Sequence, residues 1–227
     1  MIDREDNDDA TLRDDLKNLR VINKYFGGVS AVQRSLTALI NKIEEPRVIE
    51  ILDLATGSGD HPLAILRLAQ KIQRRVAITA VDKNPHILAI AREQIRQTQE
   101  ITVEQHDILS LPYPPKHFDI VLCSLAIHHL SKQHAVTLLG IMQRLSRVGF
   151  IVNDLSRSWL AAWTAWLYTR LTTRNPMTLH DSYLSVLRAF TPSELQEIAR
   201  EAGIQNFIIR HRPFFRLVLI GENQCTQ

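Results

Sequence analysis

RVIEILDLATGSGD, residues 47–60, decides the fold of this chain, because it joins the pattern of a buried strand directly to a glycine turn. Residues 48–54 form a nearly continuous apolar run, which is typical of a strand covered on both faces of a parallel sheet. Thr56-Gly57-Ser58-Gly59 then lets the backbone turn sharply and approach a ligand closely. Residues 61–72 carry apolar side chains at helical spacing, so the turn lies at a helix N-terminus. Together these elements predict a nucleotide site.

Acidic residues follow the next two predicted strands. The strand at 76–81 ends at Asp82, at about the distance beyond the glycines where a carboxylate can bind ribose hydroxyls. The short strand at 101–105 is followed by Asp107, where the next strand of the same sheet would end. A dinucleotide fingerprint requires a third glycine where this chain has Pro62, so the pattern argues against a nicotinamide cofactor.

The chain resembles the class I S-adenosylmethionine-dependent methyltransferases over roughly residues 20–220. Residues 53–59, DLATGSG, are similar to the family's first motif, and residues 118–124, FDIVLCS, to its fourth strand. One departure is Ala55, where many members carry glycine. The resemblance implies S-adenosylmethionine as the cofactor. The residues it assigns to binding this cofactor are Asp53, Ala55, Thr56, Gly57, Gly59, Asp82, Lys83, Asp107, Ile108, Ser124 and Leu125.

S-adenosylmethionine carries an ammonium, a carboxylate and a sulfonium but no phosphate. Its site therefore needs an anion, backbone N–H groups and a wall that excludes water. We expect Asp53 to face the ammonium through a water molecule, and the backbone of Gly57 and Gly59 to lie along the carboxypropyl chain. Asp82 matches the family's ribose-binding acid, and Asp107 and its neighbour match the pair that meets the adenine. The alternative for Asp53 is a carboxylate that only caps the turn.

The order of the predicted elements indicates an α/β protein with a doubly wound sheet, because strands alternate with helical patterns and imply right-handed crossovers. The strand at 149–153 closes the parallel set. Two apolar strands, 206–210 and 214–220, are joined by a very short connection through Arg212-Pro213 and must form an antiparallel hairpin. The resemblance implies a seven-stranded, mostly parallel sheet with a reversed C-terminal strand.

Length and composition predict one domain with small additions, since the chain has 227 residues, of which 45% are hydrophobic and 22% charged. We expect residues 1–10 to form a disordered acidic tail and residues 11–46 an N-terminal helical cap. Residues 47–227 are expected to form the cofactor-binding core, with a helical lid inserted at about 155–190.

The net charge and the cysteine content limit the kinds of partner and site that the chain can have. The formal net charge is +3 and the isoelectric point about 9.0, with scattered basic residues, so we expect no nucleic-acid partner. The two cysteines suggest neither a disulfide framework nor a metal site. The acidic N-terminal stretch lacks an apolar signal core, which favours a cytoplasmic enzyme. The apolar runs of the chain are too short for stable membrane insertion. The sequence leaves open whether the protein forms a homodimer.

The three tryptophans of the chain, Trp159, Trp163 and Trp166, are spaced to form one stripe on a helix after the fifth strand. Two interpretations stay open. The stripe packs on the core, or it belongs to a lid that gives an aromatic or lipophilic acceptor its pocket. The resemblance adds two aromatic residues of the cap that would face the same cleft. The candidate substrate-binding residues are Tyr25, Phe26, Trp159, Trp163, Trp166 and Asn153.

Histidines are the candidates for a catalytic base, because imidazole titrates near neutral pH. His128 and His129 follow the fourth strand, whose end faces the transferring methyl group, and His129 is the first choice. His180, beside Asp181 in a predicted linker, is a further candidate. The alternative is that each histidine only donates a hydrogen bond to a backbone carbonyl or stabilises a turn. We expect no metal, because Asn153-Asp154 at the fifth strand has no carboxylate counterpart at the fourth.

The predicted function is methyl transfer from S-adenosylmethionine to a small lipophilic or aromatic acceptor, with a phenolic hydroxyl oxygen as the first choice. The chain is also similar to the ubiquinone and menaquinone pathway methyltransferases, so carbon methylation of a quinol or polyketide-derived ring is the alternative. A non-catalytic nucleoside-binding module is the alternative of another class, since fold does not determine function.

Overall fold

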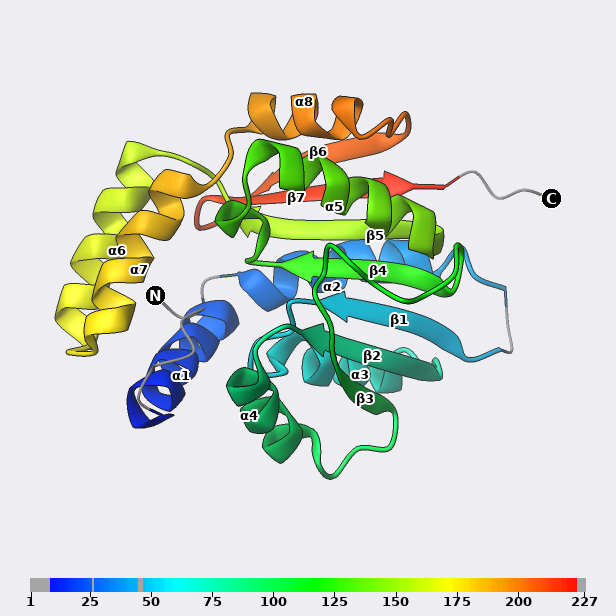
Figure 1. The fold of residues 1–227 in the computed structure, drawn as a ribbon, viewed down its shortest axis with the longest axis horizontal. Helices are drawn as coiled ribbons and strands as arrows, with labels where there is room; N and C mark the ends of the chain where they lie inside the picture. Colours follow the sequence, from blue (N-terminus) through cyan, green and yellow to red (C-terminus); the bar gives the residue numbers. More distant parts are fainter. Residues whose placement is uncertain (1–8, 26, 45–46, 224–227) are drawn as a thin grey trace.

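The computed structural model describes residues 9–25, 27–44 and 47–223, which form one sheet with helices on both faces and a group of helices at one end (Figure 1). The strands are β1 (Ile49–Leu54), β2 (Val76–Asp82), β3 (Ile101–Gln105), β4 (Phe118–Ser124), β5 (Ser146–Leu155), β6 (Phe207–Arg212) and β7 (Arg216–Glu222). The helices are α1 (Asp9–Tyr25), α2 (Gly28–Ile40), α3 (Asp60–Lys71), α4 (Pro85–Ile95), the 3₁₀ helix η1 (Ile127–His129), α5 (Lys132–Leu145), α6 (Trp159–Thr172), α7 (Pro176–Arg188) and α8 (Pro192–Glu201).

The sheet has seven strands in the order β3-β2-β1-β4-β5-β7-β6. All neighbours from β3 to β5 run parallel, and β7 pairs antiparallel with both β5 and β6. The predicted doubly wound, mostly parallel sheet with a reversed C-terminal strand is therefore confirmed. The strand order reverses between β1 and β4, and ligands of such sheets bind at this switch point, beyond the carboxyl ends of the strands.

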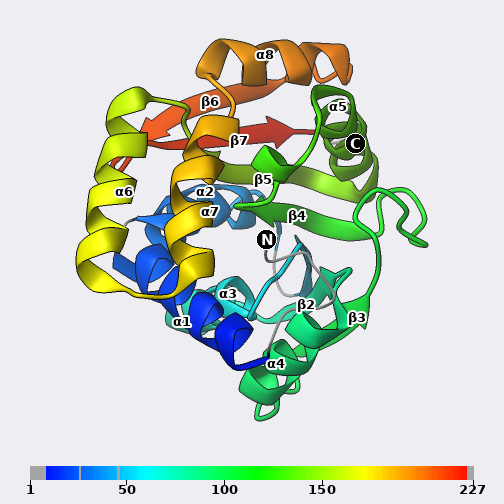
Figure 2. The ribbon, with the colours of Figure 1, turned by 60° about the vertical axis from the view of Figure 1, so that its left-hand side comes forward.

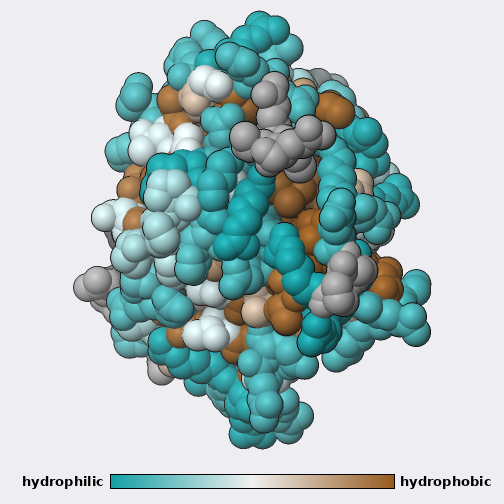
Figure 3. Space-filling view, turned by 90° about the vertical axis from the view of Figure 1, so that its right-hand side faces the viewer, coloured by the Kyte–Doolittle hydropathy of each residue, from teal (hydrophilic) through white to brown (hydrophobic). Residues whose placement is uncertain are grey.

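Two apolar cores cover the two faces of the sheet. Side chains of α2, α3 and α4 pack with one face of the central strands, and side chains of α5 and α8 pack with the other. Every residue of β4 is buried, as the predicted burial of the parallel strands requires. The end of the molecule at the amino ends of the parallel strands is mostly hydrophilic, with scattered apolar residues (Figure 3). The remaining helices lie at the opposite end of the sheet.

Local signals in the sequence set several element boundaries. The predicted capping box at the start of α8 is present, because the Thr191 side chain accepts from the Glu194 N–H and the Glu194 carboxylate accepts from the Thr191 N–H. The predicted hairpin is present, but β7 begins at Arg216 rather than at Phe214. Phe214 and Phe215 instead form the turn, with φ angles of 61° and 53° in the left-handed region. The sequence analysis was wrong here because such turns usually use glycine or asparagine.

Helices α1, α6 and α7 lie together at the carboxyl ends of the parallel strands (Figures 1 and 2). The Thr178 hydroxyl of α7 donates a 2.6 Å hydrogen bond to the buried carboxylate of Asp15 in α1. The Asn18 side chain of α1 also donates to Thr178, at 3.2 Å. Residues 155–190, the predicted lid, contain α6 and α7, which we call the lid for their position over the strand ends, and the segment that contains His180 is a helix rather than the predicted linker.

The predicted disordered tail falls mostly outside the described residues, which begin at residue 9. Its last two residues, Asp9 and Ala10, belong to α1 and are helical. The predicted cap at 11–46 contains α1 and α2.

Candidate active site

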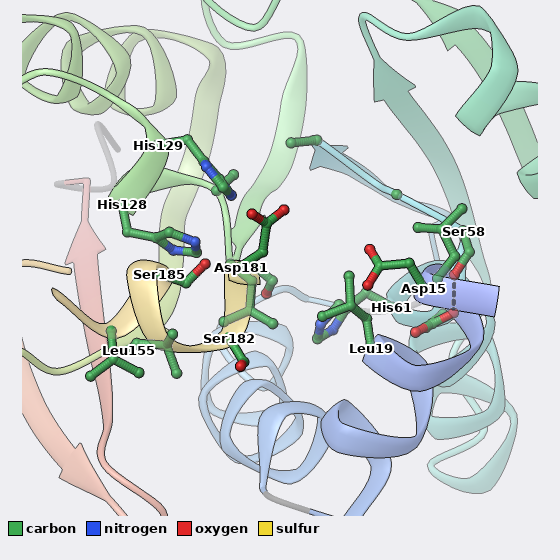
Figure 4. A pocket seen from close by; sticks show the side chains of 18 of the residues that line it. Asp15, Leu19, Ser58, His61, His128, His129, Leu155, Asp181, Ser182 and Ser185 are labelled. Carbon is green, nitrogen blue, oxygen red and sulfur yellow. Dashed lines mark hydrogen bonds between the residues drawn. The ribbon is translucent and has the colours of Figure 1, made fainter. Parts of the chain in front are cut away.

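A cavity of about 800 Å³ lies at the carboxyl ends of β1, β2 and β4, under α1 and the α6–α7 lid. Cavities of roughly 300–1,000 Å³ hold small-molecule ligands. Residues after the strands form one wall, and residues of α1, α6, α7 and the β6–β7 turn form the others. Figure 4 shows Asp181, Ser182 and Ser185 of α7 between His128 on one side and Asp15 of α1 on the other. The cavity therefore extends from the strand ends, where the predicted cofactor residues lie, to the lid helices α6 and α7.

The turn after β1 approaches the cavity through a left-handed backbone. Ala55, Gly57 and Gly59 have φ angles of 53°, 58° and 83°. The Gly57 N–H donates to the Asp82 carboxylate at 3.1 Å, which ties the turn to the end of β2. A Cβ atom on Gly59 would lie 2.7 Å from the Cδ1 atom of Ile95 in α4. Glycine is required at this position by both backbone angle and space.

Asp53 is a buried carboxylate at the end of β1, behind the turn that lines the cavity. Burial is the main cause that raises the pKa of Asp53 to about 7, and the nearby charges of Asp60 and Asp82 contribute to this shift. Its Oδ2 atom has no hydrogen-bond partner among the described residues. A buried acceptor without a donor is costly, so this position fits a ligand that brings a cationic donor, either directly or through water.

The structure brings the predicted cofactor residues together around one end of the cavity. Asp107 follows β3 at this end and accepts the Leu109 N–H at 2.8 Å. Asp53 and Gly59 do not line the cavity themselves but support the residues that do. Those that line it directly are Ala55, Thr56, Gly57, Asp82, Lys83, Asp107, Ile108, Ser124 and Leu125. This arrangement fits the chemistry of S-adenosylmethionine, because acids lie at the strand ends and a turn with small side chains lets a ligand approach the backbone closely.

A histidine–carboxylate pair faces the other end of the cavity. The Nδ1 atom of His128 lies 2.6 Å from Oδ1 of Asp154, and the His128 N–H donates to Oδ2 at 3.1 Å. Both side chains are buried, and His128 lines the cavity. Burial alone would raise the pKa of Asp154, but the charge and hydrogen bonds of His128 and the Leu155 N–H together lower it. Asp154 therefore stays ionised and orients the imidazole ring.

Arg216 at the start of β7 is a second buried charge near this pair. Its side chain is almost fully buried, and it lines the cavity. Burial lowers the pKa of Arg216 to about 10, while the charge of Asp154 opposes this shift. The guanidinium remains cationic at neutral pH and helps to keep Asp154 ionised.

His129 also lines the cavity, and its ring lies 4.1 Å from that of His128 between centroids. His128, rather than the predicted first choice His129, has the buried carboxylate partner. His180 is exposed on α7 and does not line the cavity, whereas its neighbour Asp181 does. Because α7 is helical, adjacent side chains point in different directions.

The tryptophans of α6 point away from the cavity. Trp159, Trp163 and Trp166 are 80%, 52% and 39% exposed, and none of them lines the cavity. Both sequence-based interpretations are therefore corrected: the stripe neither packs on the core nor contacts the pocket. Small residues explain this orientation, because Ala161 and Ala162 are buried in contact with Val186 of α7. Close helix packing selects the alanine face of α6 and leaves the bulky face outside.

Other predicted substrate residues differ in their positions. The side chain of Tyr25 and the whole of Phe26 lie outside the described residues. Asn153 of β5 is fully buried, and neither polar atom of its side chain has a partner among the described residues. It does not line the cavity.

Aromatic residues that the sequence analysis missed do line the cavity. They are Tyr168 on the inner face of α6, and Phe214 and Phe215 at the β6–β7 turn. The sequence contained a signal for the turn, because two adjacent aromatic residues where a hairpin needs left-handed backbone are unusual. Tyr168 was not predicted, because the tryptophan spacing indicated the opposite face of the helix.

Neither a metal cluster nor a membrane-spanning helix is present among the residues that the structure describes. Among the described residues, no three His, Cys, Asp or Glu side chains are grouped so that they could hold a metal ion. Within the same described part of the chain, none of the helices is both long and apolar enough to cross a membrane.

Sequence comparisons relate the chain to quinone-modifying enzymes. Residues 51–149 match a family model described as a methyltransferase domain. A demethylmenaquinone methyltransferase of Deinococcus radiodurans is 31% identical over 105 residues, which are 46% of this chain and 41% of that protein. A demethylmenaquinone methyltransferase of Thermotoga maritima is 26% identical over 216 residues, covering 86% of this chain and 88% of that protein. The first match thus spans less than half of the relative's length.

Solved structures share the fold at low identity. A SAM dependent methyltransferase from Aquifex aeolicus aligns with a TM-score of 0.62 and 14% identity, over 95% of this chain and 98% of that chain. The CurJ carbon methyltransferase aligns with a TM-score of 0.68 and 14% identity, over 97% of this chain and 62% of that one. At this identity the likeness establishes the fold and leaves the acceptor open.

Proposed function

Because the chain belongs to the class I S-adenosylmethionine-dependent methyltransferases, we propose that it methylates an electron-rich aromatic ring that carries an ionisable hydroxyl group. The observation that carries this proposal is the buried His128–Asp154 pair at the end of the cavity that the cofactor residues leave free. Such a pair is the usual arrangement for an oriented general base. The acceptor class is therefore a phenol or a hydroquinone.

The cofactor end of the cavity would hold S-adenosylmethionine through Asp82 at the ribose hydroxyls and Asp107 with Ile108 at the adenine. Asp53, behind the turn, would reach the ammonium through a water molecule, and the charge of the ammonium would favour the ionised carboxylate. When bound, S-adenosylmethionine supplies an electrophilic methyl group on a sulfonium, which is already a good leaving group. The chain's own residues then need mainly to align the acceptor, exclude water and remove a proton.

His128 would remove that proton. Its Nδ1–H donates to Asp154, which leaves Nε2 as the acceptor for the hydroxyl proton of the bound ring. The resulting phenolate attacks the methyl carbon through oxygen or through a ring carbon, while the carbon–sulfur bond breaks. For attack through carbon, His128 would first release its proton to water and would then accept the proton of that ring carbon, so that the ring becomes aromatic again. Both outcomes need the same base.

The walls of the cavity favour a lipophilic acceptor. Tyr168, Phe214 and Phe215 contribute aromatic surface, and Leu155 contributes aliphatic surface next to His128. A carbon acceptor in a quinol ring is our first choice, because the relatives include demethylmenaquinone methyltransferases and a 2-phytyl-1,4-naphtoquinone methyltransferase of Synechococcus elongatus. The phenolic oxygen favoured by the sequence analysis becomes the second candidate.

The proposal is tested with S-adenosylmethionine carrying a deuterated methyl group and a panel of short-chain naphthoquinols and phenols. Each acceptor is paired with the same molecule whose hydroxyl groups are capped as methyl ethers. We expect product only from the free hydroxyl forms, and fragmentation in the mass spectrometer locates the label on ring carbon or oxygen. Calorimetric binding of S-adenosylhomocysteine without any methylated product would instead support the non-catalytic nucleoside-binding alternative.

A further inference from the structure

The outer surface of the lid carries an apolar patch that the fold does not use. We call it the tryptophan face, and it consists of Trp159, Leu160, Trp163, Trp166 and Leu171 on α6. Each of these side chains is at least 39% exposed, and Trp159 and Leu171 reach 80% and 77%. Contiguous apolar surface of this kind marks an interaction site in folded proteins. Figure 2 shows α6 at the outer edge of the molecule, with α7 beside it.

The tryptophan face is exposed because the other side of α6 is already occupied. Ala161 and Ala162 pack against α7, and Thr164, Ala165 and Tyr168 line the cavity. The helix is thus apolar on both sides, with small residues inside and large residues outside. Packing within this chain explains the small residues on the inner side of α6. It does not explain the large residues of the tryptophan face, which remain exposed.

The exposed cations of the segment that contains the tryptophan face outnumber its acids. Residues 155–190 contain four arginines and a single acid, Asp181, which lines the cavity. Arg157 is paired with Glu194, which leaves Arg170, Arg174 and Arg188 as exposed cations of the lid. The Arg170 guanidinium lies over the Trp166 ring, 5.0 Å from its centroid. The lid surface is therefore both aromatic and cationic.

We propose that the tryptophan face and its arginines dock the protein on the surface of an anionic phospholipid bilayer. Tryptophan concentrates at membrane interfaces, where its ring is partly buried and its N–H stays hydrated, and arginine pairs with lipid phosphates. Helix α6 has 14 residues, so it lies in the interface and does not cross it. A second copy of this face is a poor partner, because docking would bring the arginines of both copies together.

Docking would also serve the proposed function, on which this one step rests. The same helix that presents tryptophans outward presents Tyr168 and Thr164 to the cavity. A lipophilic acceptor dissolved in the bilayer would then reach the cavity without crossing bulk water. The docking itself does not depend on which acceptor is methylated.

The tryptophans supply their own probe, because all three tryptophans of the chain lie on this face. Intrinsic fluorescence is recorded for the full chain with vesicles of phosphatidylcholine alone and of phosphatidylcholine mixed with phosphatidylglycerol. We expect a blue shift with the anionic vesicles that high salt reverses, and flotation of the protein with the same vesicles. Changing Arg170, Arg174 and Arg188 to glutamine should weaken binding about fivefold for each arginine.

Matched variants distinguish docking through the tryptophan face from nonspecific adsorption to lipid through any exposed apolar side chain. Trp159→Ala with Trp163→Ala should abolish flotation, whereas Ile208→Ala, which removes an exposed apolar side chain of β6, should not change it. Thermal melts confirm that each variant is folded. Unshifted fluorescence with both vesicle types overturns the proposal, and so does a lipid-free blue shift that grows with protein concentration, which indicates self-association. Methylation of short-chain quinols without vesicles tests the proposed function separately.

Discussion

Two walls of one cavity are built in different ways. The turn wall consists of residues 55–58 and Asp82, with Gly59 as its support, and the lid wall consists of α6 and α7. Backbone conformation and a backbone N–H to carboxylate bond hold the turn wall, on strands buried from both sides. The lid wall rests on a small apolar cluster around Ala161, Ala162 and Val186 and on hydroxyl contacts with α1. Such an arrangement suits a fixed cofactor site beside an adaptable acceptor site.

The catalytic prediction has the largest expected effect, because His128 lies where the two walls meet. His128→Ala should lower kcat by about 10²- to 10⁴-fold, since the loss of a positioned general base typically costs this much. His129→Ala should lower kcat by less than about tenfold, because the His129 side chain is exposed and water can replace it as a proton acceptor. Single-turnover rates of both variants, measured with saturating cofactor, test this difference. Equal losses in both variants would contradict the assignment of His128 as the base.

The second prediction concerns pH and the support of the turn wall. The pKa of Asp53 is about 7 in the folded protein, above its value of about 3.8 in the unfolded chain, so the folded state holds a proton that the unfolded state releases. Stability from this group is present at low pH and is lost as pH rises from about 4 to about 7, by at most about 4 kcal/mol.

Asp53→Asn removes this dependence. We expect the variant to gain stability relative to the wild type at about pH 8 and to differ little at about pH 4. Urea unfolding at both pH values measures the difference, and titration of His61, whose pKa burial lowers to about 4, cancels because both proteins contain it. A difference in stability that is the same at both pH values would show that Asp53 is ionised in the free protein.

The third prediction compares two glycines of the turn wall. Gly59→Ala should destabilise the protein by about 2–4 kcal/mol, because the added methyl group combines left-handed strain with a clash against Ile95. Gly57→Ala meets no atom within 4 Å and should cost only the backbone strain, about 1–2 kcal/mol. Urea denaturation without cofactor measures both. If Gly57→Ala proved the more damaging variant, the packing of α3 on α4 would not be the controlling contact.

The smallest expected effect distinguishes the two faces of the lid wall. Tyr168→Ala should raise the KM for a lipophilic acceptor about tenfold in a lipid-free assay, because part of the cavity surface is lost. Trp163→Ala, on the outer face of the same helix, should change this KM by less than about twofold. Steady-state kinetics with a short-chain quinol checks both. A larger effect of Trp163 would mean that the lid rearranges when the acceptor binds.

Much of the turn wall was predictable from the sequence. The apolar run of β1, the glycines after it and the acids after β2 and β3 are local signals, and parallel strands bring their carboxyl ends to one edge. That is why the sequence predicts that Asp82 and Asp107 lie at one site. Whether Asp53 faces a cofactor or only supports the turn is not a local property, because it depends on how completely neighbouring elements bury it.

The sequence by itself determined the alternation of strands and helices, the glycine turn after the first strand and the antiparallel C-terminal hairpin, because each depends on neighbouring residues and on general rules of chain connection. Only the tertiary structure decided which face of α6 meets the cavity and which histidine meets a carboxylate. The first depended on alanines that allow close packing with α7, and the second on Asp154, 26 residues away along the chain. Contacts between distant segments are set by packing, which the spacing of residues within one helix does not reveal.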